Sequence, residues 1–472
     1  MNQTSYRKEI EAYFADKEPA LIAAISRLVA IRSVKEAPAA GAPFGPGPAA
    51  CLNEALQMAS DLGFAVQNHE GYVGTADLND KETAVHILGH LDVVGEGTGW
   101  TVTEPYAPKL VDGMLYGRGT DDDKGPLIAA LFAMKAVKDL GLPLTKNARL
   151  IMGTDEESGS EDIAYYYNNH PFAPYAFSPD ADFPLINIEK GSYKPTFSAQ
   201  WSETAATPRV SSIGGPFRIN VVPAAAEAVV IGMTPSELAP YFEKATAKTG
   251  VTFTATATAD GKTAIRADGQ GGHAASPEEA NNALTGLVSM LSSLPLANIH
   301  STVALRALSI LFPHGDYYGK AIGVAQKDDI SGHLTLVLSM MDFSETGFSG
   351  RFDSRVPLCG NEENCKKVAQ AAFKAYEFTC TGDMDAPHHT EAESPFVQTL
   401  LKCYEEYTGN TNSKPLAIGG GTYVHDIPGG VAFGCAMPGF VSNLHGPDEH
   451  ARVADLMTSA KIFTQAIAEL CS

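Results

Sequence analysis

The stretch Thr83-Ala-Val-His-Ile-Leu-Gly-His90-Leu-Asp92-Val-Val94 decides the fold class. Its first six residues are mostly apolar and Gly89 ends the run, as expected of a short buried strand in an α/β sheet. Ligands of open α/β sheets bind outside the carboxyl ends of the strands, which is where His90 and Asp92 follow. A His-x-Asp pair can place the imidazole on a metal ion while the carboxylate orients it. A loop histidine beside a turn aspartate is the alternative interpretation.

The segments around this strand favour the same α/β class. Residues from about Glu9 to Arg32 have the spacing of one amphipathic helix. Pro126 to Leu140 also has helical spacing, with Pro126 in the first turn, where its missing N–H costs nothing. Ala148 to Met152 is a second short apolar run and predicts another buried strand.

The residue composition of the chain changes after Gly191. Residues 195–265 are rich in Thr, Val and Ala and alternate in patches, as strands do. Helix and short-strand texture returns from about Ser394, with helices predicted over Pro395–Tyr407 and Asp455–Leu470. We therefore predict one α/β domain made of both chain ends and interrupted by an inserted α+β domain.

Two further motifs carry adjacent acidic residues. Tyr116-Gly-Arg-Gly-Thr-Asp-Asp-Asp-Lys-Gly-Pro126 places three aspartates between glycines, and glycine permits the sharp backbone geometry that a cation-bridging carboxylate needs. A capped, solvated helix entrance is the alternative. In Gly153-Thr-Asp-Glu-Glu-Ser-Gly159, Glu156 and Glu157 repel each other unless a cation or a proton lies between them. One can bind a metal ion while the other takes a proton from water, and an exposed acidic loop is the alternative.

The remaining motifs lie nearer the C-terminus of the predicted α/β domain. Ser178-Pro-Asp180-Ala-Asp182 reads as a turn when taken alone. Gly419-Gly-Gly-Thr-Tyr-Val-His425 brings glycine backbone close to another group, which we interpret as substrate near Gly420. His445 lies in Leu444-His-Gly-Pro-Asp-Glu-His450.

Taken together, these motifs are hard to explain by a purely structural role. Histidine, aspartate and glutamate at successive strand ends supply ligands for two cations and leave one carboxylate for base chemistry. The sequence has no His-Glu-x-x-His, no Gly-x-Ser-x-Gly and no complete phosphate loop. Metal-dependent chemistry is therefore the favoured hypothesis.

Composition excludes several functional classes. The chain has 472 residues, enough for two or three domains, and its 34 Lys+Arg against 55 Asp+Glu give a net charge of −21 that repels nucleic acid and anionic lipid. No apolar run approaches the roughly 18–20 residues of a membrane-spanning helix. The seven cysteines are scattered without a C-x-x-C pair, as in reduced cytoplasmic proteins. We expect a cytoplasmic protein with no nucleic acid or membrane partner.

The motifs GHLDVV, YGRGTDDDKGP, GTDEESGS, SPDADFP, GGH, GGGTY and HGPDEH follow one another in this order. In this respect the chain resembles the M20 metallopeptidase family, and within it the PepV-like bacterial dipeptidases, from about Ile22 to the C-terminus. The resemblance implies a zinc-peptidase-like α/β catalytic domain with a central mixed β-sheet flanked by helices, formed by residues 1–191 and 386–472. It also implies an inserted α+β lid domain, residues 192–385.

The resemblance assigns roles to residues of the catalytic domain. The implied metal ligands are His90, Asp122, Glu157, Asp180 and His445, with nearby Asp182 as the competitor of Asp180. Asp122 is the implied bridging ligand, and the family has a cis peptide after it. Asp92 orients the imidazole of His90, and Glu156 is the implied general base. The cofactors are two divalent metal ions, with Zn²⁺ expected first and Mn²⁺ or Co²⁺ as alternatives.

Further implied roles concern the substrate. In the lid, His273 resembles the histidine that stabilises the oxyanion, and Asn220 and Arg355 resemble residues that hold the substrate ends. Dipeptidases of this family commonly have Ala-Arg where this chain has Val424-His425, so His425 is the candidate for a pH-dependent substrate contact.

The expected function is metal-dependent hydrolysis of dipeptides by a metal-bridged water, with a glutamate general base and a lid that captures the free substrate ends. The expected partner is a small peptide substrate, and a monomer is sufficient because the lid of this branch partly mimics a second subunit. N-acyl-amino-acid amidohydrolysis is the alternative on the same fold. A non-catalytic binding protein is the remote alternative.

Overall fold

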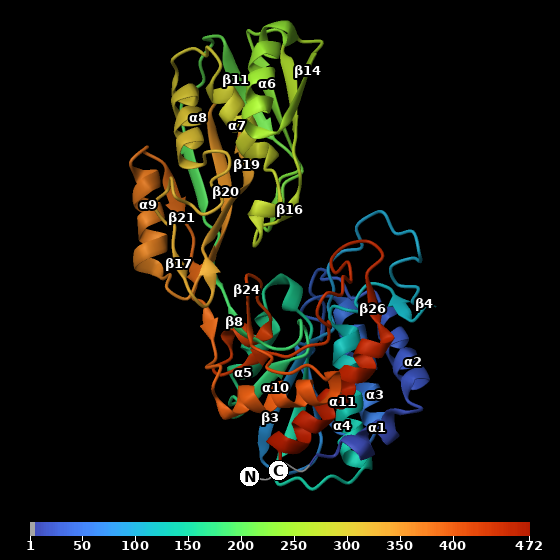
Figure 1. Cartoon of the computed structure of the whole chain (residues 1–472). Helices are drawn as coiled ribbons and strands as arrows, with labels where there is room; N and C mark the ends of the chain where they lie inside the picture. Colours follow the sequence, from blue (N-terminus) through green and yellow to red (C-terminus); the bar gives the residue numbers. More distant parts are fainter. Residues whose placement is uncertain (1–4) are drawn as a thin grey trace. The chain divides into compact units, whose positions relative to one another are not determined.

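The structure is a computed structural model that describes residues 5–472. The chain divides into two compact units, which are described separately below (Figure 1). Unit 1 comprises the chain up to residue 188 together with residues 389–472, and unit 2 comprises residues 189–388. The sequence analysis placed the two boundaries at residues 191/192 and 385/386.

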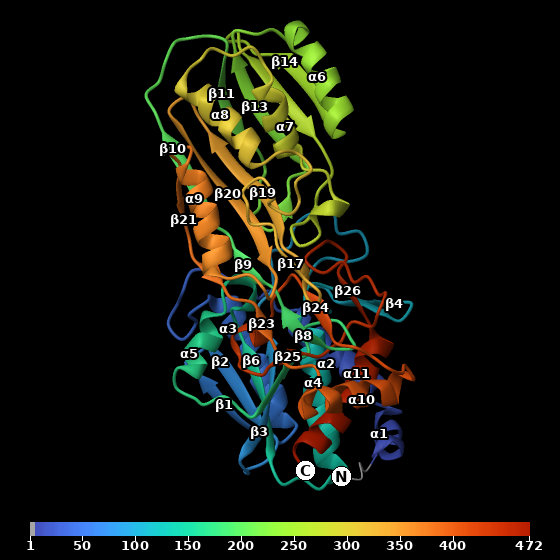
Figure 2. The ribbon, with the colours of Figure 1, turned by 60° about the vertical axis from the view of Figure 1, so that its left-hand side comes forward.

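A nine-stranded mixed sheet forms the centre of unit 1, with strand order β1-β2-β6-β3-β7-β25-β8-β23 and β24 paired to β8. Figure 2 shows β1, β2, β6 and β3 side by side. β3 runs parallel to both β6 and β7, whereas β1, β2 and β6 pair antiparallel. The strands are β1 (Ala65–His69), β2 (Val73–Asp77), β3 (Thr83–His90), β6 (Asn147–Gly153), β7 (Tyr175–Ser178), β8 (Ile186–Glu189), β23 (His388–His389), β24 (Leu416–Ile418) and β25 (Val431–Ala432).

Helices cover both faces of this sheet. One face packs on the larger core cluster, to which α2, α3, α4, α10 and α11 contribute, and the other packs on α5 and the short helix η4. Successive residues of β3 point to opposite faces, since Ile87 belongs to the first cluster and Leu88 to the second. This arrangement confirms the predicted mixed sheet flanked by helices.

The helices of unit 1 are α1 (Arg7–Phe14), α2 (Glu18–Val29), α3 (Pro46–Asp61), α4 (Lys124–Asp139), α5 (Glu161–Tyr167), α10 (Pro395–Thr408), α11 (Val453–Leu470), and the 3-10 helices η1 (Glu156–Ser158) and η4 (Tyr423–Asp426). A separate three-stranded sheet has the order β26-β5-β4, with β4 (Lys109–Val111), β5 (Met114–Tyr116) and β26 (His450–Arg452).

Helix α4 is the most deeply buried of these elements. Its first eight residues, from Lys124 to Leu131, are all buried, and it packs against α11 and β3. The Lys124 Nζ donates hydrogen bonds to the carbonyls of Leu28 and Ile31, at 3.0 and 2.9 Å, at the end of α2. The buried ammonium group therefore ties the first residue of α4 to the chain segment that ends α2.

The prediction of one helix from Glu9 to Arg32 was wrong. The chain forms α1 and α2 instead, and residues 15–17 between them are not helical. Pro19 explains the break, because it lies in the first turn of α2, where a proline is tolerated, whereas inside a continuous helix its ring would clash with the preceding turn.

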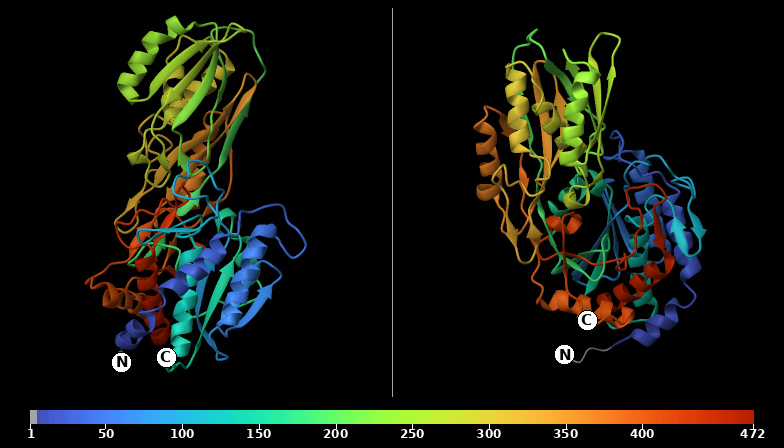
Figure 3. Two further views of the ribbon diagram at one scale, coloured as in Figure 1. Left: turned by 90° about the vertical axis from the view of Figure 1, so that its right-hand side faces the viewer. Right: turned by 45° about the horizontal axis from the view of Figure 1, so that its top comes forward.

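Unit 2 contains a ten-stranded antiparallel sheet with the order β14-β15-β13-β11-β19-β20-β10-β21, in which β9 also pairs with β20 and β22 pairs with β9. Figure 3 shows its helices, coloured green to yellow and orange, lying along the strands. The strands of this sheet are β9 (Gly191–Tyr193), β10 (Thr196–Gln200), β11 (Arg209–Gly214), β13 (Ala225–Ile231), β14 (Thr252–Ala257), β15 (Thr263–Asp268), β19 (Thr335–Phe343), β20 (Gly347–Val356), β21 (Thr379–Thr381) and β22 (Met384–Asp385).

The other elements of unit 2 complete an α+β unit with its own apolar core, as predicted. Two small ribbons pair β12 (Val221–Val222) with β16 (Gly272–His273) and β17 (Lys327–Asp328) with β18 (Gly332–His333). The helices are α6 (Pro235–Thr249), α7 (Ala283–Ser292), α8 (His300–Leu311), α9 (Lys367–Lys374) and the short η2 (Pro277–Glu279) and η3 (Glu362–Lys366).

No helix within residues 5–472 combines the length and the apolar character that crossing a membrane requires.

Phe463 of α11 provides a test of the unit 1 core. Its side chain is fully buried, and its ring lies 5.5 Å from that of Phe177 and 5.8 Å from that of Phe433. Phe463→Ala is expected to lower the free energy of unfolding by about 3–5 kcal/mol, because the truncation leaves a cavity among these rings. Urea denaturation followed by circular dichroism measures it. Phe172→Ala is the matched control, since Phe172 is 45% exposed; equal losses in both variants would contradict the packing described here.

Candidate metal centre

The parallel pairing of β3 with β6 and β7 brings three chain segments to one edge of the sheet. His90 is the last residue of β3 and pairs in register with Gly153, the last residue of β6. Glu156 begins η1 just after β6, and Asp180 follows the end of β7 by two residues. Because parallel strands end at the same edge, the side chains that follow them meet there.

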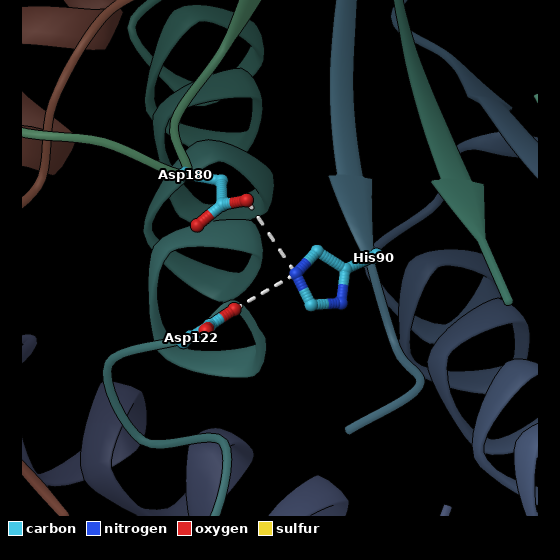
Figure 4. A group of neighbouring side chains, drawn as sticks. All are labelled: His90, Asp122 and Asp180. Carbon is cyan, nitrogen blue, oxygen red and sulfur yellow. Dashed lines mark hydrogen bonds and ion pairs between the residues drawn. The ribbon is translucent and has the colours of Figure 1, made fainter. Parts of the chain in front are cut away.

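The first group of candidate ligands is His90, Asp122 and Asp180 (Figure 4). The Nε2 of His90 lies 2.9 Å from Oδ1 of Asp122 and 3.5 Å from Oδ2 of Asp180. The His90 ring is completely buried. Asp182, the competitor of Asp180, is exposed and bridges to Ala436 through its backbone instead. The structure therefore brings Asp180, and not Asp182, to His90.

The second group shares Asp122 with the first. It consists of Asp122, Glu157 and His445, and the Nε2 of His445 lies 2.9 Å from Oδ2 of Asp122 and 3.2 Å from Oε2 of Glu157. The two oxygens of Asp122 therefore face two different imidazoles, which is the arrangement of a bridging carboxylate. The peptide bond between Asp122 and Asp123 is cis, as the resemblance implied.

Asp92 holds both the imidazole and the glutamates. Its carbonyl oxygen lies 2.9 Å from Nδ1 of His90, and its carboxylate oxygens accept the backbone N–H groups of Glu156 and Glu157, each at 3.1 Å. The Nδ1 of His90 thus has the Asp92 carbonyl as its partner, and Nε2 faces the carboxylates. Metal-binding histidines commonly have such a second hydrogen bond, which fixes the orientation of the ring.

The clustered carboxylates shift the pKa values of both histidines. Burial lowers the pKa of His445, but its hydrogen bonds with Asp122 and Glu157 outweigh this and raise the pKa to about 11. Burial likewise opposes the charged form of His90, and hydrogen bonds with Asp122 and Asp180 raise its pKa well above the usual value. Burial raises the pKa of Glu156 well above its usual value, and the charge of Asp180 adds to the rise.

The donor set fits divalent cations. In each group the ligand atoms lie within 4.8 Å of one another, and together the groups offer two imidazoles and three carboxylates. Imidazole and carboxylate ligands suit Zn²⁺, Mn²⁺ and Co²⁺. Positive charge at these positions would also replace the protons that the two histidines otherwise carry between the carboxylates.

Comparison with known proteins shows the family of the chain. Residues 86–469 match the sequence profile described as "Peptidase family M20/M25/M40". The chain belongs to this family. It is therefore a metallopeptidase, and the predicted resemblance to the M20 family is confirmed; its narrower placement among PepV-like dipeptidases stays a prediction.

Full-length relatives share the family. The chain is 35% identical over 460 residues to the protein named "Putative dipeptidase YtjP" of Bacillus subtilis (strain 168), covering 96% of this chain and 98% of that protein. It is 30% identical over 465 residues to the beta-Ala-Xaa dipeptidase of Lactobacillus delbrueckii subsp. lactis, covering 96% of each. The crystal structure of human carnosine dipeptidase 1 shares the fold, with a TM-score of 0.58 at 16% identity over 99% of both chains.

Two further predicted residues of unit 1, Gly420 and His425, lie in the glycine-rich segment 419–425. His425 is half-buried in η4, and a Cβ added at Gly420 would meet Ile418 Cδ1 at 3.8 Å, an ordinary contact. Val424, the other residue that differs from the usual dipeptidase pair, is fully buried against Ile186 and Ala432. The Val424 change therefore belongs to the core, whereas His425 remains the candidate for substrate contact.

In unit 2, two of the predicted substrate residues, Asn220 and His273, lie on neighbouring segments of backbone. The exposed His273 lies on β16 and pairs with Val221, and the amide of Ala274 donates to the carbonyl of Asn220 at 3.0 Å. The amide of Ala275 donates to Nδ1 of His273 at 3.2 Å, so a neutral ring carries its proton on Nε2. Arg355 of β20 is buried and forms a two-point contact with Asp353, at 2.7 and 2.9 Å.

Sequence reasoning missed one buried pair behind the centre. The Asp162 carboxylate accepts hydrogen bonds from the amide of Thr154 and from the hydroxyl of Tyr423, each at 2.5 Å, and burial raises the pKa of Asp162 to about 7. The Tyr423 ring stands edge-on to the His90 ring, 6.2 Å away. Tyr423 belongs to the GGGTY motif and could have been found there, but Asp162 has no sequence signal beyond an ordinary helix start.

Cation binding is expected to release protons. With its pKa raised to about 11, His445 carries a proton at pH 7 in the metal-free protein, and the raised pKa of His90 favours its protonated form as well. Metal ions bind the neutral imidazole, so saturation with Zn²⁺ at pH 7 should release about two protons per chain from the two rings, to which any proton on Glu157 or Asp180 adds, because burial raises the pKa of both. A titration with a pH indicator in weak buffer measures the release.

His445→Ala should reduce this release by about one proton at saturating Zn²⁺, whereas the exposed His300 replaced by Ala should leave it unchanged. Zn²⁺ binding without proton release would contradict the assignment of the two imidazoles as ligands.

Proposed function

We propose that this chain is a dipeptidase that uses two divalent metal ions. The observation that carries the proposal is the sharing of Asp122 between two histidine-carboxylate groups, with Glu156 fixed beside them by Asp92. The names of the two full-length relatives, both dipeptidases, support the choice of substrate class.

The metal ions would be held by His90, Asp122, Glu157, Asp180 and His445. Divalent cations held there would supply Lewis-acid polarisation of the scissile carbonyl and would lower the pKa of a bound water molecule. Zn²⁺ is the first expectation, with Mn²⁺ or Co²⁺ as alternatives.

Glu156 carries the proton chemistry in this proposal. Its carboxylate accepts a proton from the attacking water and donates it to the leaving amine, so that one residue serves as base and then as acid. Burial raises the pKa of Glu156, which makes its carboxylate a stronger base than that of an exposed glutamate. Asp92 holds the backbone amide of Glu156 and so fixes the place from which the carboxylate acts.

Unit 2 would act as the lid that recognises the substrate. His273, with its proton on Nε2, can donate a hydrogen bond to the oxyanion of the tetrahedral intermediate. Arg355 would bind the free C-terminal carboxylate, with Asp353 holding the guanidinium plane, and Asn220 would hold a further polar group of the substrate. Groups that bind both ends of a substrate select its length, which favours dipeptides over longer chains.

We also propose that the enzyme works as a monomer in the cytoplasm. The seven cysteines are free and five of them are buried, as expected in a reducing compartment. The net charge of −21 opposes binding to nucleic acid or to an anionic membrane.

Glu156→Gln is expected to lower kcat by about two to four orders of magnitude, because the amide cannot accept the proton of the attacking water. Steady-state hydrolysis of an L,L-dipeptide gives kcat, and elemental analysis of the same sample gives the metal content, which should stay at the wild-type value. The exposed Glu161, five residues along the chain, provides the matched Glu161→Gln control with unchanged kcat. A Glu156→Gln enzyme with wild-type kcat would overturn the assignment of the base.

Substrate length tests the dipeptidase proposal directly. The metal-free protein, reloaded separately with Zn²⁺, Mn²⁺ or Co²⁺, is given an L,L-dipeptide, a β-Ala dipeptide, a tripeptide and an N-acetyl amino acid, and released amino acids are quantified. Metal-dependent cleavage confined to the dipeptides is the expected result. Cleavage of the N-acetyl amino acid alone would instead indicate the amidohydrolase, and metal binding without any cleavage would favour a binding protein.

A further inference from the structure

Glu449 is a fully buried carboxylate that the proposed mechanism does not use. It lies four residues after His445, and both its side chain and that of its partner Arg118 are almost completely inaccessible. The Arg118 Nη1 donates to Oε2 of Glu449 at 2.6 Å, and its Nη2 donates to the carbonyl of Gly446 at 3.1 Å. The pair thus joins the segment that carries His445 to the segment that carries Asp122.

The second oxygen of Glu449 collects backbone amides. Its Oε1 accepts the N–H groups of Gly119 at 2.9 Å, Asp121 at 3.2 Å and Asp122 at 3.3 Å. The Glu449 backbone carbonyl accepts one more amide, that of Gly117, at 3.0 Å. One residue therefore binds most of the turn that ends at the shared carboxylate, through a side chain whose other oxygen is held by Arg118.

The position of Asp122 has little tolerance. Its Oδ1 and Oδ2 each lie 2.9 Å from the Nε2 of a different histidine, His90 on one side and His445 on the other. Metal–ligand distances are fixed to within about 0.2 Å, so a small shift of the Asp122 backbone would bring one oxygen out of range of its cation. The amide of Asp122 is among those that Glu449 holds.

We propose that Glu449 is a positioning residue that fixes the bridging Asp122 between the two cation sites. The inference rests on the proposed two-metal function. It predicts a role beyond stability, since loss of the carboxylate would change the geometry of the shared ligand in protein that is still folded. Contacts behind metal ligands are typically worth about 10–100-fold in metal affinity or activity.

The experiment is a Co²⁺ titration of the metal-free full-length chain, followed by visible absorption, for wild type and Glu449→Gln. The glutamine keeps the size of the side chain, but its NH₂ group must face either Arg118 or the backbone amides, all of which are donors. Two Co²⁺ ions per chain are expected for wild type. The variant should bind the second Co²⁺ about 10–100-fold more weakly, with an altered absorption spectrum and a lower kcat at nearly unchanged KM.

Two further variants make the result specific. Glu449→Asp keeps the charge but is too short to reach Arg118 and the amides together, so an intermediate loss of Co²⁺ affinity is expected even if the glutamine variant does not fold. Asp448→Asn is the matched control, because Asp448 also accepts two amides, those of Thr101 and Val102 at 2.8 and 2.9 Å, but these precede no candidate ligand. It should keep wild-type Co²⁺ binding.

The two proposals fail in different ways. Wild-type protein with a single Co²⁺ site would overturn the two-metal function, and the role of Glu449 would fall with it. Wild-type protein with two sites, together with folded Glu449 variants that keep the second affinity and the spectrum and lose only thermal stability, would overturn the positioning role alone.

Discussion

One carboxylate shared between two imidazoles is the constraint on which the rest of unit 1 depends. The oxygens of Asp122 face His90 and His445, which lie 355 positions apart in a chain of 472 residues. To bring them together, β3 must end where the turn before α4 begins, and the segment before α11 must return to the same place. The small sheet that pairs β26 with β5 makes this return, since it joins His450 to Tyr116 in register.

Several carboxyl side chains lie close together at this edge of the sheet. Asp92, Asp162 and Glu449 each accept hydrogen bonds from backbone amides and so hold loops in place. Asp122 and Glu157, in contrast, face imidazoles. A buried carboxylate needs a hydrogen-bonding partner or a cation. The carboxylates held by amides therefore shape the site, and those that face imidazoles can hold metal.

Much of the candidate site could be predicted from the sequence, because a strand end is a local feature. His90, Asp122, Glu157, Asp180 and His445 all lie in short motifs, and the structure brings them together in two groups. Local patterns could not separate Asp180 from Asp182, since the difference depends on which one faces β3.

Long-range pairing marks the limit of such reasoning. Glu449 contacts the amide of Asp122, 327 positions away in the chain, and Asp162 contacts the hydroxyl of Tyr423, 261 positions away, and a single sequence carries no periodic signal for such contacts. The pairing order of the unit 2 strands is equally non-local, and only the α+β class of that unit followed from its alternating, Thr-rich texture.

The burial of α4 has a kinetic consequence for the site. The shared carboxylate lies two residues before a helix whose first turns are inaccessible to solvent and pack against α11 and β3. Local fraying exposes amides at the ends of solvent-facing helices, but here the helix start can exchange with deuterium only when the surrounding core opens. The core of unit 1 therefore protects the backbone on the Asp122 side of the bridge, whereas His445, on the other side, lies in a loop and its side chain is 45% exposed.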